Sequence, residues 1–313
     1  MTMQPTASTS LISHSMAQPG LGSAPQTRGL RIALAGKGGA GKSAIAATLA
    51  RTLARRGHSV LALDVDTLPG LAFSLGLPLD EASLGELPAD LAERVPERGW
   101  VLKDGVEVVD LVKKYAVAAP DGVRFLQLGK LPDKVKPGST VAFRYVMEEF
   151  RDENWSLIGD MAAGTRQPFF GWGDFAELIL LVSEPSAKAV LSIRRLAKLA
   201  QPLPPAKKSK DTPSEETPSA RPMVGIIANK LRSAAELAQM EQLFGAGPGW
   251  GGLPLLATLP YDEELAEAER EKYAPLDAVP FAPAVVAIQE LAVRLEQFIG
   301  EQRQQQQQQQ QAH

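Results

Sequence analysis

Hydrophobic residues along this chain gather in short, uninterrupted runs that are separated by longer segments with helical spacing. Continuous apolar runs are typical of parallel strands covered on both faces, whereas strands with one wet face alternate apolar and polar residues. Helical stretches at 42–56 and 186–200 separate several of the runs. The pattern predicts an α/β fold, a doubly wound and mostly parallel sheet flanked by helices, with ligands at the carboxyl ends of its strands. The predicted strands are 30–35, 59–64, 124–128, 155–160, 177–183, 223–228 and 254–258.

Polar segments delimit one predicted folded domain. Residues 1–28 carry few large apolar side chains, residues 202–221 combine prolines with charged residues, and residues 304–311 are all glutamine. Such compositions bury too little apolar surface to form a core. We therefore expect a disordered tail at 1–28, a single domain at 29–300 with a polar surface loop at 202–221, and a disordered Gln-rich tail at 301–313.

The segment between the first predicted strand and the helix at 42–56 has the spacing of a phosphate-binding loop. Residues 36–43 read GKGGAGKS and fit the pattern G-x-x-x-x-G-K-[ST]. In such a loop Lys42 reaches the outer phosphates and the Ser43 hydroxyl takes a place on Mg²⁺. A glycine-rich turn without a ligand is the alternative, which the flanking strand and helix disfavour. The predicted phosphate-binding residues are Gly36, Gly38, Gly39, Ala40, Gly41, Lys42, Ser43 and Ala44.

Carboxylates follow two of the predicted strands. The strand at 59–64 ends in Asp64, and Asp66 stands two residues on, which places both on one face; this is costly unless a cation or water shares the site. Asp66 capping a turn is the alternative. The strand at 155–160 ends in Asp160, which suits a carboxylate that holds Mg²⁺ through water. Gly164 follows it, where a backbone N–H could sense the γ-phosphate.

Lys37 indicates a particular variant of the phosphate-binding loop. The run 37–43, KGGAGKS, resembles the deviant Walker A motif K-G-G-x-G-K-[ST]. That motif marks an ATPase family that includes MinD, ParA, ArsA, the nitrogenase iron protein and the CooC-type accessory ATPases of carbon monoxide dehydrogenase. The resemblance implies a P-loop ATPase domain that binds ATP and Mg²⁺ and forms an ATP-dependent homodimer, in which Lys37 reaches the partner's phosphates. A solvated loop lysine is the alternative for Lys37.

The resemblance to the CooC-type group extends to further segments, at 121–130, 160–164, 182–186, 229–230 and 259–262, and covers most of 29–300. It implies that Asp66 orients the attacking water, that Asn229 and Lys230 form the base-reading N-K pair, and that the backbone at Pro260 borders the adenine. One departure is the stretch 136–141, KPGSTV, which stands where the nickel-inserting members carry C-x-C. Hydroxyl groups do not replace thiolates for a soft metal, so metal binding between subunits by that route is not expected.

Composition narrows the functional classes. The net charge is −3 and the sequence pI about 5.8, so no global positive field attracts nucleic acid. The chain has no cysteine, which excludes disulfides, thiolate metal sites and a cysteine nucleophile. His58 follows Gly57 at a helix-to-strand turn, where we expect it to face solvent. No membrane-spanning run or secretory signal pattern is present, which favours the cytoplasm.

The leading hypothesis is a slow ATPase that dimerises on ATP and assists maturation or regulation of a client enzyme. Phe169, Phe170 and Trp172 follow the predicted γ-phosphate sensor and are candidates for a client-docking patch, unless the protein's own helices cover them. The alternative is a ParA- or MinD-like positioning ATPase that acts on DNA or membrane. For DNA the candidates are Arg194, Arg195 and Lys198, although a solvated helix face explains these more simply.

Two further observations bear on these alternatives. The last predicted helix carries Ile288, Leu291, Leu295 and Phe298 at helical spacing, but no polybasic face. Core packing therefore explains that helix better than membrane binding does. Ligase chemistry on a small molecule, as in cobyrinate and dethiobiotin synthetases, lacks a recognisable substrate motif.

Overall fold

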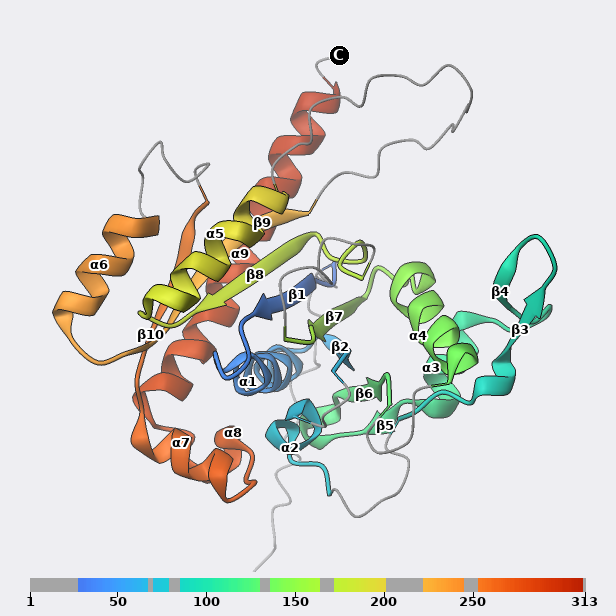
Figure 1. Cartoon of the computed structure of the whole chain (residues 1–313), viewed down its shortest axis with the longest axis horizontal. Coiled ribbons are helices and arrows are strands. Elements are labelled where there is room, and N and C mark those ends of the chain that lie inside the picture. The colour runs from blue at the N-terminus through green and yellow to red at the C-terminus, as the bar shows by residue number, and fades with distance from the viewer. Residues whose placement is uncertain are drawn as a thin grey trace, which may run out of the picture.

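The computed structural model describes residues 28–66, 70–78, 85–129, 136–163, 172–200, 222–244 and 253–311. Within them an eight-stranded sheet runs in the order β10-β9-β8-β1-β7-β2-β6-β5 (Figure 1). Every neighbouring pair is parallel except β5 and β6. The predicted α/β fold is therefore confirmed. The strands are β1 (Arg31–Gly36), β2 (Ser59–Asp64), β5 (Val117–Ala118), β6 (Arg124–Gln127), β7 (Trp155–Asp160), β8 (Leu178–Ser183), β9 (Met223–Leu231) and β10 (Leu255–Pro260).

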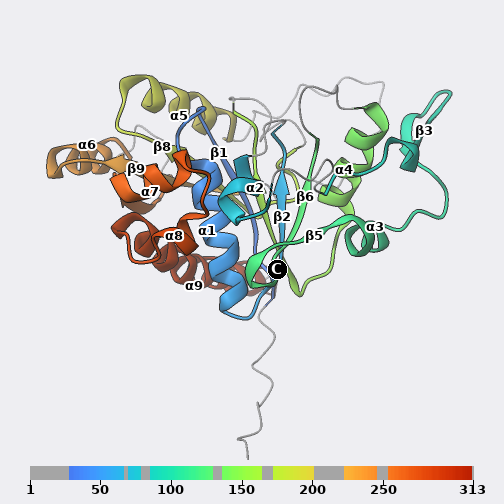
Figure 2. The same ribbon diagram turned by 90° about the horizontal axis from the view of Figure 1, so that it is seen from below.

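Helices cover both faces of this sheet (Figure 2). One face carries α1 (Lys42–Arg55), α2 (Gly70–Leu75) and α9 (Pro283–Gln311). The other face carries α3 (Val108–Tyr115), α4 (Pro137–Glu149), α5 (Ala187–Ala200) and α6 (Ala234–Phe244). The short helices α7 (Glu263–Arg270) and α8 (Pro275–Ala278) connect β10 to α9. Both faces of the central strands are buried, which explains why their sequences are continuous apolar runs.

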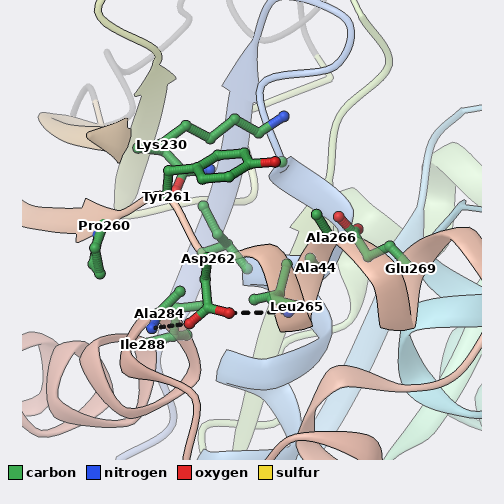
Figure 3. Close-up of a pocket in the computed structure, with 13 residues that line it drawn as sticks. Ala44, Lys230, Pro260, Tyr261, Asp262, Leu265, Ala266, Glu269, Ala284 and Ile288 are labelled. Carbon is green, nitrogen blue, oxygen red and sulfur yellow. Dashed lines mark hydrogen bonds between the residues drawn. The ribbon is translucent and has the colours of Figure 1, made fainter. Parts of the chain in front are cut away.

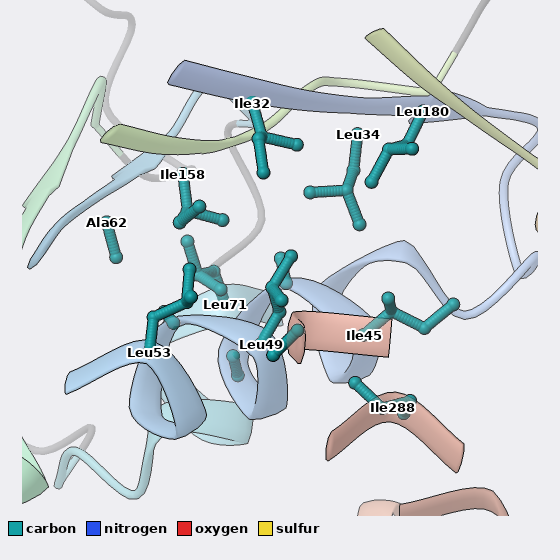
Figure 4. Close-up of a cluster of buried hydrophobic side chains, with 14 of the residues drawn as sticks. Ile32, Leu34, Ile45, Leu49, Leu53, Ala62, Leu71, Ile158, Leu180 and Ile288 are labelled. Carbon is teal, nitrogen blue, oxygen red and sulfur yellow. The ribbon is translucent and has the colours of Figure 1, made fainter. Parts of the chain in front are cut away.

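The core between the sheet and α1 shows why this helix forms and where it packs. Apolar residues recur on α1 at Ile45, Leu49 and Leu53, which places them on one face of the helix. These side chains meet Ile32 and Ile158 of the two central strands (Figure 4). Packing against the sheet therefore fixes the helix directly behind the glycine-rich loop.

One part of the fold was absent from the sequence analysis. A two-stranded antiparallel ribbon, β3 (Ala92–Val95) and β4 (Gly99–Leu102), lies apart from the main sheet and contacts α4 (Figure 1). The 3₁₀ helix η1 (Ala89–Leu91) precedes it, and a second, η2 (Pro120–Gly122), joins β5 to β6. The ribbon strands are short, and of their residues only Ala92 is buried. They therefore lack the buried apolar run that revealed the main strands.

The prediction for the glutamine tract is wrong for residues 301–311. Helix α9 continues through Gln311, and the glutamines at 304–309 are exposed on it. Glutamine has good helix propensity, and a helix already nucleated by packed residues extends at little cost. Arg303 also anchors this part, because it forms an ion pair with Glu177 at 2.6 Å and donates to the carbonyl oxygen of Gly29.

The first part of α9 packs as predicted. Ile288, Leu291 and Leu295 are buried, and Phe298 packs against the same core. None of the helices in the described ranges is long and apolar enough to cross a bilayer. Residues 1–27 of the predicted tail at 1–28 lie outside the described residues, as does the predicted loop at 202–221.

The expectation for His58 is wrong as well. Its side chain is buried, with Nδ1 3.0 Å from Ser156 Oγ and Nε2 2.9 Å from Glu296 Oε1. Glu296 lies on α9 and also accepts hydrogen bonds from Arg56, so α9 is held against the turn between α1 and β2. The contact comes from a residue far away in the sequence, so the local pattern did not contain it.

A buried arginine ties α1 to the α8 region. The Arg51 side chain is 2% exposed, and its guanidinium donates to Asp121 at 2.6 Å and to both carboxylate oxygens of Asp277 at 2.6 and 2.7 Å. Arg55 on the next turn pairs with Asp121 at 3.0 Å, but it is 44% exposed. The two arginines share the same carboxylates and differ in burial.

This difference generates a stability prediction. Arg51→Met should lower the free energy of unfolding by about 2 kcal/mol, because a buried guanidinium with three short hydrogen bonds is lost. Arg55→Met should cost less than about 1 kcal/mol, as exposed ion pairs do. Urea denaturation of both variants measures this. Equal losses would show that burial of Arg51 does not matter.

Candidate functional site

The glycine-rich loop at residues 36–43 joins the carboxyl end of β1 to α1. Gly41 occupies the N-cap position with φ 91°, a conformation that favours glycine. At Gly36 an added Cβ would lie 2.5 Å from the carbonyl oxygen of Val182, so this position also requires glycine. No side chain caps α1, and its first turn contains no acidic residue. The N–H groups at this helix start are left for an anion.

Lys42 and Ser43 are the first two residues of α1, and they face the sheet edge. Lys42 is 8% exposed, and its Nζ donates to the carbonyl oxygen of Lys37 at 3.4 Å. The Ser43 hydroxyl donates to Asp160 Oδ2 at 2.5 Å. The loop and the end of β7 therefore meet, as the sequence analysis predicted for a phosphate and metal centre.

Three aspartates gather at this edge. Asp64 and Asp160 are register partners on the neighbouring strands β2 and β7. Both are buried, with exposed fractions of 0% and 2%. The Asp64 carboxylate accepts the backbone N–H groups of Asp66 at 3.0 Å and Leu71 at 3.3 Å. It therefore fixes the chain at the half-buried Asp66, which directly follows β2 and Val65, and at the start of α2.

The proton affinities of these groups reflect their burial. Burial raises the pKa of Asp160 from 3.8 to about 6; the charge of Asp66 adds to this, and Ser43 and Lys42 oppose it. Burial and the charge of Asp160 raise the pKa of Asp64 well above its usual range. Negative charge is thus costly here unless a cation joins the site.

The donor set at this point fits Mg²⁺. Asp160 Oδ1 is buried and has no hydrogen-bond partner among the described residues, while Oδ2 receives the Ser43 hydroxyl. An orphaned carboxylate oxygen beside a hydroxyl offers the hard oxygen ligands that Mg²⁺ prefers. Ser43 and Asp160 are therefore the residues that could hold the ion, directly or through water.

A pocket adjoins the loop on the side of β9 and β10 (Figure 3). Gly41, Ala44, Asn229, Lys230 and Pro260, all predicted to contact nucleotide, line it. Asn229 donates to the carbonyl oxygen of Ala40 at 2.8 Å, and Lys230 donates to that of Gly39 at 2.7 Å. The structure thus brings the predicted base-reading residues to the loop itself.

The sequence analysis did not predict α7, which forms the far wall of this pocket. The side chain of Asp262 caps α7 by accepting the Leu265 N–H at 3.0 Å, and it also accepts the Ala284 N–H at 3.2 Å (Figure 3). Asp262 before the run Glu-Glu-Leu is an N-cap signal that could have located α7. The additional lining residues are Ile45, Tyr261, Asp262, Leu265, Ala266, Glu269, Ala284 and Ile288.

Lys37 lies at the outer side of the loop. Its side chain is 44% exposed, and Nζ is 3.9 Å from Glu184 Oε1 at the end of β8. A loose, exposed pair of this kind contributes little stability. The ammonium group is therefore accessible from outside the chain.

The remaining candidate residues lie in part beyond the described residues. Gly164, Phe169 and Phe170 fall outside them, as does the side chain of Lys198. Trp172 is half-buried and packs against the core beneath α4 and α5. On α5, Arg194 is half-buried and Arg195 is exposed.

The buried Asp160 generates a prediction for the ligand-free protein. Its raised pKa means that the folded state binds the proton more tightly than the unfolded chain, so the free energy of unfolding falls as pH rises between 3.8 and about 6. Asp160→Asn should raise that free energy by roughly 1 to 3 kcal/mol at about pH 8 and far less at about pH 4. Urea denaturation at both pH values tests this.

The control for this experiment is Asp104→Asn, which changes an exposed carboxylate in the loop after β4. It should leave the free energy of unfolding unchanged at both pH values. If Asp160→Asn destabilised the protein at about pH 8, buried charge would not be the dominant effect of Asp160.

Comparisons with known proteins agree with this geometry. An ATP-binding protein of Methanocaldococcus jannaschii is 28% identical over 252 residues, which cover 77% of this chain and 88% of that protein. The carbon monoxide dehydrogenase accessory protein CooC of Rhodospirillum rubrum is 25% identical over 187 residues, 56% of this chain and 70% of that protein.

Solved structures show the same fold. The septum site-determining protein MinD of Pyrococcus horikoshii, complexed with Mg-ADP, aligns with a TM-score of 0.60 at 18% identity, over 86% of this chain and 96% of that one. A ParA family ATPase of Chlorobium tepidum aligns with a TM-score of 0.59 at 18% identity, over 85% and 98%. Residues 32–276 match the family model for the CobQ/CobB/MinD/ParA nucleotide binding domain. The chain belongs to this family.

Proposed function

We propose that this protein binds ATP with Mg²⁺ and hydrolyses it slowly, as a dimeric switch that assists maturation or regulation of a client enzyme. The orphaned Asp160 carboxylate beside Ser43, at the uncapped start of α1, is the observation that carries the proposal. It supplies a cation site within reach of a helix N-terminus that favours anions. A complex of Mg²⁺ with a nucleotide provides both a cation for the carboxylate and an anionic phosphate for the helix N-terminus.

Each group then has a role set by its position. The N–H groups of the loop and Lys42 hold the phosphate oxygens, and Ser43 and Asp160 hold the metal. When bound, Mg²⁺ neutralises charge on the phosphoryl oxygens. Asp66 orients the attacking water, and Asp64 fixes Asp66 by accepting its backbone N–H. The adenine occupies the pocket beside Asn229, Lys230 and Pro260.

Dimerisation on ATP rests on Lys37. Its side chain is 44% exposed, and among the described residues its ammonium group pairs only with Glu184, at 3.9 Å, so little energy opposes its movement toward the phosphates of a second subunit. A second cation there would stabilise charge on the transferring phosphoryl group. Client docking near Phe169, Phe170 and Trp172 remains a prediction.

The role in enzyme maturation takes its support from the relative named as an accessory protein. A positioning role on DNA or membrane is the second candidate, supported by the likeness to MinD and ParA and by Lys188 and Arg195, which are exposed on α5. ATP-dependent co-sedimentation with DNA or with anionic liposomes would favour positioning. If the protein co-sedimented with neither DNA nor liposomes in ATP, a role in assisting a client enzyme would be favoured.

Two substitutions separate binding from turnover. Lys42→Ala should weaken ATP binding by at least about 100-fold, because it removes a charge-assisted contact to phosphate. Asp66→Ala should keep ATP binding and lower turnover by about 100-fold, because it removes only the group that positions water. Calorimetry and phosphate release measure these two quantities. Unchanged affinity in Lys42→Ala would overturn the assignment of the loop.

Oligomeric state tests Lys37. With ATP and Mg²⁺, Lys37→Ala should bind nucleotide but remain monomeric, whereas Asp66→Ala should accumulate as a dimer. Light scattering distinguishes the two masses. If both variants had the same mass in ATP, Lys37 would not act across an interface.

A further inference from the structure

We propose that Lys230 and Asn229 hold the glycine-rich loop in its anion-binding conformation, so that they position the phosphate site as well as border the base. The inference rests on the proposed nucleotide binding and adds a role for the end of β9. Two hydrogen bonds, a bulge in β9, a left-handed backbone conformation at Lys230 and a close approach at Gly41 connect the end of β9 to the loop.

The two hydrogen bonds end on successive loop carbonyls. Asn229 Nδ2 donates to Ala40 at 2.8 Å, and Lys230 Nζ donates to Gly39 at 2.7 Å. A loop that turns its N–H groups toward an anion directs carbonyl groups away from it, and these need donors. The two β9 side chains supply them.

The backbone of β9 is shaped to deliver these side chains. Thr258 pairs with Ala228 and Pro260 with Leu231, so β9 contains one residue more than β10 between these pairs. The additional residue creates a bulge at Asn229 and Lys230. Bulges redirect side chains and are enriched next to active sites.

Lys230 also has a φ of 63°, which is uncommon for a residue with a side chain. Such conformations persist where the surrounding structure requires them. From this conformation the Lys230 side chain extends over Tyr261 toward the loop (Figure 3). The strain therefore directs the ammonium group to the Gly39 carbonyl.

The loop leaves space at Gly41 for the side chain of Asn229. A Cβ on Gly41 would lie 2.5 Å from Asn229 Nδ2. Gly41 thus provides the space that the Asn229 amide occupies, besides adopting a left-handed conformation. Loop and bulge form one unit, and a change in either should disturb the phosphate site.

This arrangement predicts a specific pattern of ligand binding. A residue that only borders the base should matter for ATP and be irrelevant to tripolyphosphate, which has phosphates and no base. A residue that holds the loop should matter for both ligands. Lys230→Met should therefore weaken Mg²⁺-dependent binding of ATP and of tripolyphosphate by about tenfold each.

Leu265→Ala is the matched control, because Leu265 lines the pocket from α7. It should weaken ATP binding and leave tripolyphosphate binding unchanged. Lys230→Arg, which retains donors, should recover most of the affinity. If Lys230 acted only as a distant positive charge, high salt would screen that charge and remove the effect of Lys230→Met. Because we propose a direct hydrogen bond, the effect should persist at high ionic strength.

Hydrogen exchange of the ligand-free protein tests the same inference without nucleotide. In Lys230→Met the amides of residues 37–44 should exchange faster than in the wild type, while those of α6 should not change. Unchanged loop exchange, or a Lys230→Met defect confined to ATP, would overturn the inference. Failure of the wild type to bind ATP would instead refute the proposed function, and the exchange result would still decide the role of Lys230.

Discussion

Burial of negative charge at the carboxyl ends of β2 and β7 is the constraint on which the site depends. Asp64 and Asp160 are register partners with almost no exposure. Two such carboxylates cannot both be ionised cheaply without a cation. Lys42 and the Ser43 hydroxyl offset part of the cost for Asp160. The rest of the unfavourable free energy of burying this charge would be offset by a divalent ion. The lysine and serine at the start of α1 lie where they reduce that free energy.

The rest of the fold holds this edge in place. Parallel strands bring the ends of β1, β2 and β7 together, and the packing of Ile45 and Leu49 against the sheet fixes α1 behind the loop. Asp262 joins the end of β10 to α7 and α9, and Arg51 joins α1 to α8. The walls of the pocket are therefore attached to the same helix that carries Lys42 and Ser43.

Sequence reasoning predicted the parts of this site that local pattern determines. The apolar runs placed Asp64 and Asp160 at strand ends, because parallel strands buried on both faces read as continuous apolar runs. The loop motif located Lys42 and Ser43. The contact between Ser43 and Asp160 follows from the pairing of β1 with β7. The local sequence around Lys42 does not determine that pairing.

The parts that sequence reasoning missed depend on distant contacts. The predicted strand at 223–228 stopped before Asn229, because the bulge interrupts the apolar run that marks the strand. His58 was expected to face solvent, yet Glu296 of α9 covers it. Glutamines at 304–309 were expected to lack structure, yet α9 extends through them. A distant contact decides the case of His58, whereas in α9 the helix propensity of glutamine extends a helix that packing has already nucleated.

We propose that the buried carboxylate of Asp160 needs Mg²⁺ and nucleotide to carry its negative charge. Titration calorimetry of ATP into the wild type and Asp160→Asn, each with Mg²⁺ and with a chelator, measures this. Mg²⁺ should tighten ATP binding to the wild type far more than to Asp160→Asn. Equal tightening in the two proteins would show that Asp160 does not hold the ion.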